Sequence, residues 1–110
     1  MTDAEFLALY HATLSDIETL VEDAITEHDA EIDYESGNDM LTLSFRTGTV
    51  AIISRQSAVH QLWLAARSGG FHFEWDEAQE QWLCTLNGQT LQDMLSEVCL
   101  EQGGVRVRFN

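Results

Sequence analysis

Four carboxylates recur at every second position in the stretch HDAEIDYESGND, residues 28–39. They alternate with Ala30, Ile32 and Tyr34, and they are Asp29, Glu31, Asp33 and Glu35. Carboxylates are hard oxygen ligands that suit calcium, magnesium, manganese or iron and do not favour tight zinc binding. Tyr34 stands where an EF-hand loop needs glycine, so the spacing does not predict that calcium motif. The pattern predicts a row of shallow, partly hydrated metal sites that bind weakly. We expect little selectivity, so that various divalent or trivalent cations can substitute for one another.

The same alternation predicts the element that carries these side chains. Polar and apolar residues that alternate are typical of a half-buried strand, so Ala30, Ile32 and Tyr34 should face a core while the acids face water. Carboxylates on one side of a strand lie about 7 Å apart, and each such pair repels by roughly 0.6 kcal/mol in bulk water before salt screening. The simpler interpretation is a solvated edge strand whose charges discourage aggregation, and the pattern alone leaves both interpretations open.

A second set of carboxylates belongs to a predicted amphipathic helix. From Asp3 to about His28, apolar residues recur at three- and four-residue spacing, and Thr2 or Asp3 can cap the start. Asp23 and Glu27 fall at the C-terminal end, where the helix dipole favours cations. This conflict suggests that the acids serve something other than stability. Helix and strand together predict one anionic surface, here called the acidic ridge, whose eight members are Glu18, Glu22, Asp23, Glu27, Asp29, Glu31, Asp33 and Glu35.

The remaining chain predicts a sheet followed by one more helix. Short alternating runs joined by short turns give six strands, which favours antiparallel pairing. Thr90 is a candidate cap for a second helix that Gly103 and Gly104 close, and VRVRFN at 105–110 suggests a seventh, short edge strand. The fold class expected is therefore α+β, a two-layer sandwich with both helices on one face of a six- or seven-stranded antiparallel sheet. A length of 110 residues suits a single domain, 1–110.

A candidate protein-binding surface lies in the middle of the sequence. In QLWLAA, Trp63 and Gln61 fall on one face of the predicted strand and the leucines on the other. Trp63 beside Gln61 and Arg55 on an open sheet face has the composition of an interface hot spot. Periodicity alone equally permits Trp63 to be an ordinary core residue.

Composition excludes several function classes. The net charge is −14, and residues 1–45 carry −12 of it because they hold twelve acids and no Lys or Arg. Such a field repels nucleic acid and anionic lipid and attracts cations or a basic protein surface. No catalytic motif stands out, which favours a binding protein over an enzyme. Without a membrane span or signal-peptide pattern, we expect a cytoplasmic protein with Cys84 and Cys99 reduced and buried.

The sequence resembles the frataxin family over nearly its full length. The resemblance is carried by the acidic N-terminal region, SRQSAVHQLWLAARSGG at 54–70, FHFEWD at 71–76, QWLC at 81–84 and NGQTLQDML at 87–95. Ser54 and Ala58 depart from the Asn and Pro that are common in the family at these positions.

The resemblance implies a non-enzymatic role in iron-sulfur cluster assembly. Frataxins bind Fe²⁺ and Fe³⁺ weakly on an acidic ridge, act as regulators and iron chaperones, and engage the cysteine desulfurase and the scaffold protein. Carried over, the iron ligands are the acidic ridge, and the partner-binding residues are Arg55, Gln56, Gln61 and Trp63. We expect a monomer in the absence of metal. Two alternatives remain at this point: an acidic inhibitor that mimics nucleic acid and covers a basic protein, and, less strongly, a carboxylate ferroxidase.

Overall fold

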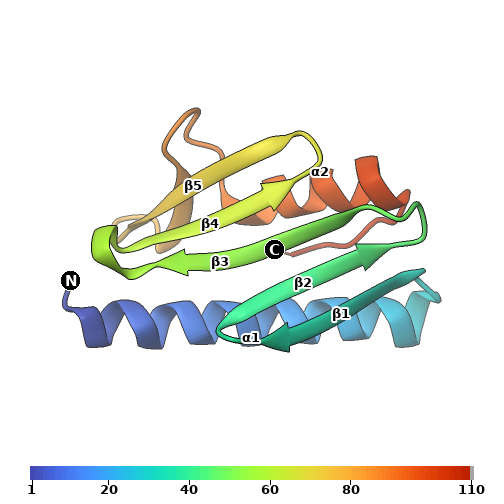
Figure 1. Cartoon of the computed structure of the whole chain (residues 1–110), viewed down its shortest axis with the longest axis horizontal. Helices are drawn as coiled ribbons and strands as arrows, with labels where there is room; N and C mark the ends of the chain where they lie inside the picture. The colour runs from blue at the N-terminus through green and yellow to red at the C-terminus, as the bar shows by residue number, and fades with distance from the viewer. Residues whose placement is uncertain (110) are drawn as a thin grey trace.

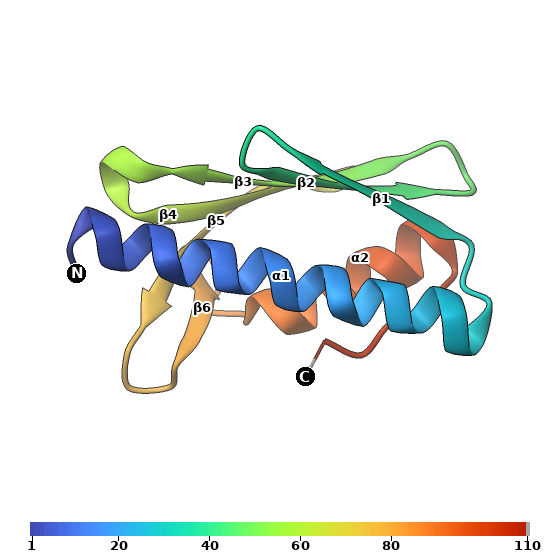
Figure 2. The same cartoon turned by 90° about the horizontal axis from the view of Figure 1, so that it is seen from below.

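The computed structural model describes residues 1–109. The chain begins with one long helix, continues through six strands with a single 3-10 turn, and ends with a second helix and an extended tail. The elements are α1 (Asp3–His28), β1 (Ile32–Gly37), β2 (Met40–Phe45), β3 (Val50–Gln56), η1 (Ser57–Val59), β4 (Gln61–Ala66), β5 (Gly69–Asp76), β6 (Gln81–Cys84) and α2 (Leu91–Gly103). Both helices cover one face of the sheet and leave the other open (Figures 1 and 2). The predicted α+β sandwich is confirmed.

The sheet is antiparallel, with its strands in the order β1-β2-β3-β4-β5-β6. Tight turns set this order. Asn38 and Asp39 both have positive φ, which gives the two-residue hairpin between β1 and β2, and Gly48 with φ +86 closes the next. Because every strand pairs with its neighbour in sequence, alternate residues of all six strands face the helices, and the set between them faces outward.

The core forms between the helix-facing side of the sheet and the two helices. Helix α1 begins with a capping box in which Thr2 accepts from the Glu5 amide and Glu5 accepts from the Thr2 amide. Its buried stripe, which includes Phe6, Tyr10, Ile17 and Val21, packs against buried residues of the sheet and α2. Those residues include Leu41, Leu43, Ile53, Leu62, Leu64, Phe73 and Leu95. Leu62 and Leu64 of β4 thus face the helices, which decides between the two alternatives that the sequence left open for Trp63.

The end of the chain departs from the sequence-based prediction. The segment after α2 is extended and alternates buried Val107 and Phe109 with exposed Arg106 and Arg108, yet it forms no strand over residues 104–109. Gly104, with φ +65, ends α2 in the left-handed conformation and turns the chain back along the helices, on the side away from the sheet (Figure 2). The alternation that suggested an edge strand comes from packing on the helices: Val107 lines the groove beside α1, and its carbonyl accepts from Ser96 Oγ of α2 at 3.0 Å.

Cys84 and Cys99 are both buried and unpaired, as predicted. Burial raises the pKa of the Cys99 thiol to about 12. Among the helices of residues 1–109, none is long and apolar enough to cross a membrane.

Candidate functional site

The helix carboxylates lie on two different sides of α1. Val21 and Ala24 are buried against the core, and the carboxylates flank that stripe. Glu22 and Glu27 are five positions apart, which places them about 140° apart around the helix. Glu18 and Glu22 therefore form one group on the side of β1, here called the flank pair. Asp23 and Glu27 occupy the opposite flank.

The start of the acidic strand is later than predicted. Asp29 is the C-cap of α1 in the left-handed conformation (φ 51), and its backbone N–H donates to the carbonyl of Ala24. Glu31 lies between this cap and β1, which begins only at Ile32. The prediction that all four acids alternate along one strand is wrong for Asp29 and Glu31, because the chain must first leave the helix through a left-handed residue. Asp and Asn tolerate that conformation better than most side chains do.

Asp33 and Glu35 do alternate on β1 as predicted. Ile32 is buried and Tyr34 half-buried on the helix side, so the two acids, here called the strand pair, face the open side. A hydrogen-bonding interaction with Glu22 is the main cause that raises the pKa of the Tyr34 hydroxyl, and burial and the nearby charge of Glu18 act in the same direction. Tyr34 therefore lies close to the flank pair.

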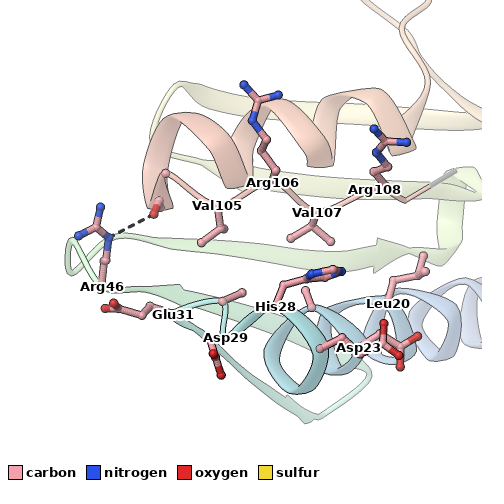
Figure 3. Close-up of a pocket in the computed structure, with 15 residues that line it drawn as sticks. Leu20, Asp23, His28, Asp29, Glu31, Arg46, Val105, Arg106, Val107 and Arg108 are labelled. Atoms are coloured by element: carbon pink, nitrogen blue, oxygen red, sulfur yellow. Dashed lines mark hydrogen bonds between the residues drawn. The ribbon is translucent and has the colours of Figure 1, made fainter.

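A groove of about 740 Å³ gathers the other half of the acidic ridge. It lies between the C-terminal half of α1 and the tail after α2 (Figure 3). The carboxylates that line it, here called the groove group, are Asp23, Glu27, Asp29 and Glu31. Val105 and Val107 point toward α1, whereas Arg106 and Arg108 point away from it (Figure 3). Arginines also line the groove, but none of them lies within 4 Å of a groove-group carboxylate in the described chain.

The acidic ridge is therefore three neighbouring groups rather than one cluster. Seven of its eight side chains are exposed, and Glu18 is half-buried. Within residues 1–109, no three His, Cys, Asp or Glu side chains converge closely enough to hold a metal ion between them. Exposed carboxylates without a shared centre can offer one or two oxygens to an ion that keeps most of its water. The shallow, weak metal sites expected from the sequence therefore stay a prediction.

The sheet-face prediction is correct for Trp63 and Gln61. Leu62 and Leu64 are buried on the helix side, and Trp63 lies half-buried on the open face. Its indole N–H donates to Gln61 Oε1 at 2.9 Å, and its ring stacks on His72 of β5 with centroids 4.2 Å apart. Gln56 pairs directly with Gln61 across β3 and β4, so it shares this face.

Arg55 does not share the face of Trp63, and that part of the prediction is wrong. Its register partner is the buried Leu62, so its side chain leaves the strand on the helix side. Arg55 there donates to Asp39 Oδ2 through Nε at 3.2 Å and Nη2 at 2.8 Å, and it also contacts Ser57. Neighbouring residues of a strand lie on opposite faces of the sheet. The sequence could not show which face Arg55 shares with Trp63, because the 3-10 turn η1 separates the two strands.

Asp39 is the residue of this region that the sequence did not single out. It accepts from Arg55 and contacts His11 Nε2 at 3.2 Å, and these two partners, Arg55 first, hold the pKa of its carboxyl below the usual value. Its backbone carbonyl accepts from the Tyr10 hydroxyl at 2.5 Å. Burial, followed by the charge of Asp39, raises the Tyr10 pKa to about 12. The turn signal at 36–39 was visible in the sequence, but its partners lie 16 to 29 residues away.

A family model described as the frataxin-like domain matches residues 1–105. The chain belongs to the frataxin family. It is 42% identical over 102 residues to the iron-sulfur cluster assembly protein CyaY of Azotobacter vinelandii, with 93% of each chain covered. It is 43% identical over 109 residues to the protein of that name in Pseudomonas fluorescens, covering 99% of this chain and 96% of the relative. The solved frataxin of Psychromonas ingrahamii matches with a TM-score of 0.82 at 31% identity, covering 100% of this chain and 99% of that one.

Membership confirms the resemblance seen in the sequence and the predicted fold class. Frataxins are non-enzymatic proteins of iron-sulfur cluster assembly, so the prediction that this chain is not an enzyme is confirmed through its family. The family binds iron and works with the cluster assembly machinery. The exposed carboxylates and the open sheet face are therefore the surfaces to consider for iron and for protein partners.

Proposed function

We propose that the protein is an iron-binding regulator and iron chaperone of iron-sulfur cluster assembly. The acidic ridge binds Fe²⁺ and Fe³⁺ weakly as cargo and contacts a basic surface of the cysteine desulfurase. Gln56, Gln61 and Trp63 on the open sheet face contact the scaffold protein. Arg55, which lies on the helix side beside Asp39, also contacts the assembly partner.

The observation that carries the proposal is that the ridge carboxylates have no cationic partner within residues 1–109. The ion pairs found within residues 1–109 involve Asp3 and Asp39, and none involves a member of the acidic ridge. Seven of the eight ridge carboxylates are exposed, and residues 1–45 carry a net charge of −12, so the acidic ridge remains free to attract cations. Such a field speeds association with a basic partner and makes it sensitive to salt.

The three-part arrangement supports an interface as well as a metal surface. Exposed carboxylates that share no centre bind single ions weakly, whereas a basic protein surface can meet all three groups at once. We therefore propose that iron and the desulfurase compete for the same carboxylates. Two free buried thiols fit a reducing compartment, and we propose the cytoplasm as the place of action. Mutual repulsion at −14 supports a monomer without metal.

The test reverses the charge of one group at a time. The variants are E18K/E22K for the flank pair, D23K/E27K/E31K for the groove group and D33K/E35K for the strand pair. Asp29 is left unchanged there, because a lysine at its left-handed backbone would perturb the helix end as well as the charge. E77K/E97K/E101K is the control for the groove variant and E77K/E97K is the control for the two pair variants, because each reverses the same number of exposed acids elsewhere.

Binding of the purified desulfurase is measured by titration calorimetry at two salt concentrations, and binding of Fe²⁺ is measured anaerobically. We expect the ridge variants to lose both activities and the controls to retain them. Unchanged affinity in all three ridge variants, with folding verified by circular dichroism, would refute the proposal. A loss equal to that of the matching control would reduce the effect to net charge alone.

A further inference from the structure

The Trp63 side chain is held in one orientation although it lies on the open face of the sheet. Register places it opposite His72, and the two rings are nearly parallel, with an interplanar angle of 10° and centroids 4.2 Å apart. The indole Nε1–H donates to Gln61 Oε1 at 2.9 Å. Gln61 in turn donates through Nε2 to Glu74 Oε2 at 3.2 Å. One indole is therefore fixed both through its ring face and through its polar edge.

The surroundings show that this arrangement is not a by-product of core packing. His72 and Glu74 are exposed, and Trp63 is only half-buried, so none of these contacts fills the space between sheet and helices. On the other side of the indole, β3 presents the small Ser54 opposite Trp63. A stacking contact and a hydrogen bond each restrict the rotamers that a surface aromatic side chain can adopt before any partner arrives.

We propose that His72 and Gln61 are positioning residues that preorganise Trp63 for contact with the assembly machinery. This role rests on the proposed function, in which the open face meets the scaffold protein. An interface side chain that is already ordered avoids an entropy cost on association. Stacking between parallel rings restricts the ring plane, and the N–H donor fixes its rotation within that plane. Each neighbour thus removes a different freedom.

The first measurement asks whether the positioning exists in the free protein. The three indole N–H signals of a ¹⁵N-labelled sample are assigned by Trp→Phe substitutions. We expect His72→Ala to shift the Trp63 indole signal, because the ring current of the imidazole is lost, and Gln61→Ala to speed its exchange with solvent. His72→Phe should keep a stacked ring and leave that exchange rate near wild type. An unmoved Trp63 signal in His72→Ala would overturn the proposal without reference to any partner.

The second measurement asks whether the positioning matters for binding. Affinity for the purified scaffold protein, alone and in complex with the desulfurase, is compared for Trp63→Ala, His72→Ala, His72→Phe and a control, Thr42→Ala, elsewhere on the same face. We expect Trp63→Ala to weaken binding most, His72→Ala to weaken it about 2- to 12-fold, the cost of ordering one side chain, and His72→Phe to restore it.

The outcomes separate the two proposals. If Trp63→Ala leaves binding unchanged, the proposed contact on the open face is wrong, and the positioning has no function in binding. If Trp63→Ala weakens binding but His72→Ala does not, the contact stands and the positioning role is refuted. If His72→Ala and His72→Phe weaken binding equally, His72 acts by touching the partner rather than by orienting Trp63, which also refutes the role.

Discussion

Glu27 lies at the end of α1 where a negative charge is least favourable, so its removal should stabilise the protein. The helix ends at His28, and the only basic residue in its last turn is that histidine. Glu27 is exposed and stands one helical turn after Asp23, a like charge. Neither has an ion-pair partner in the described chain. Glu27→Gln keeps the size of the side chain and removes only the charge.

The expected gain follows from these two repulsions. A charge of the wrong sign in the last turn of a helix costs about 0.3–1 kcal/mol at low ionic strength. A like-charge pair at i and i+4 costs about 0.2–0.5 kcal/mol. The free energy of unfolding should therefore rise by about 0.5–1.5 kcal/mol. In a chain of this size about 1 kcal/mol corresponds to about 4–8 °C in melting temperature.

The opposite end of the same helix supplies a matched control. Glu5 lies in the first turn, and its interaction with Thr2 lowers the pKa of its carboxyl. Glu5→Gln removes the same charge from a place where the dipole and the capping box favour it, so we expect a loss of stability.

The assay is urea and thermal denaturation of both variants at pH 7 in 10 mM and in 1 M NaCl. Both effects should shrink in 1 M NaCl because they are electrostatic. The reasoning would be refuted if Glu27→Gln were no more stable than wild type at low salt, or if its gain persisted unchanged in 1 M NaCl. In the first case, Glu27 would have to be engaged by a favourable partner in solution.

Three further predictions concern stability. Thr13→Val should lower the free energy of unfolding by about 1–3 kcal/mol, because the buried Trp82 indole N–H, which donates to Thr13 Oγ1 at 2.9 Å, loses its acceptor. Thr19→Val, an exposed equivalent on the same helix, should change the free energy of unfolding by no more than about 0.5 kcal/mol in urea denaturation. Arg55 lowers the folded-state pKa of Asp39, so the pair stabilises the folded protein above the ordinary aspartate pKa and loses this effect as the pH falls through the lowered value. Asp39→Asn should therefore flatten the acid limb of a profile of unfolding free energy against pH. An unchanged limb would contradict the pairing. Added salt or millimolar divalent cations should raise the melting temperature of the wild type by relieving repulsion on the acidic ridge, and a flat response would mean that its charges lie too far apart to interact.

The sequence predicted most of the fold because its elements are defined by local signals. The 26-residue helix α1 has a capping box at its start and a regular apolar stripe, and both can be read without knowing any long-range contact. The hairpins follow from turn residues between alternating runs. The same local logic failed at residues 104–109, where alternation reports a buried and an exposed side but does not say whether a sheet or a pair of helices lies beneath.

The buried side chain of Gln102 shows what local patterns could not supply. It accepts from the Arg67 amide at 2.8 Å and donates to Thr49 Oγ1 and the Val50 carbonyl, each at 3.1 Å. Gly103, next to it, is packed so closely that an added Cβ would lie 2.5 Å from the Phe45 ring. Both features depend on where two sheet turns meet the end of α2. No spacing within a single segment encodes that meeting point.

In the candidate site, too, the sequence predicted the charge but not the three-dimensional arrangement. The charge, the ligand type and the outward direction of Asp33 and Glu35 follow from composition and period. The separation into three groups does not, because it depends on the left-handed Asp29 and on the two flanks of α1. This separation bears on function. A single converging cluster would bind one ion tightly and hide its charge, whereas groups facing the open sheet, the flank of α1 and the groove beside the tail keep the charge accessible. The proposed function, in which the protein takes up and releases iron and docks on a basic surface, is better served by the second arrangement. The destabilisation predicted at Glu27 would then be the stability that this arrangement gives up.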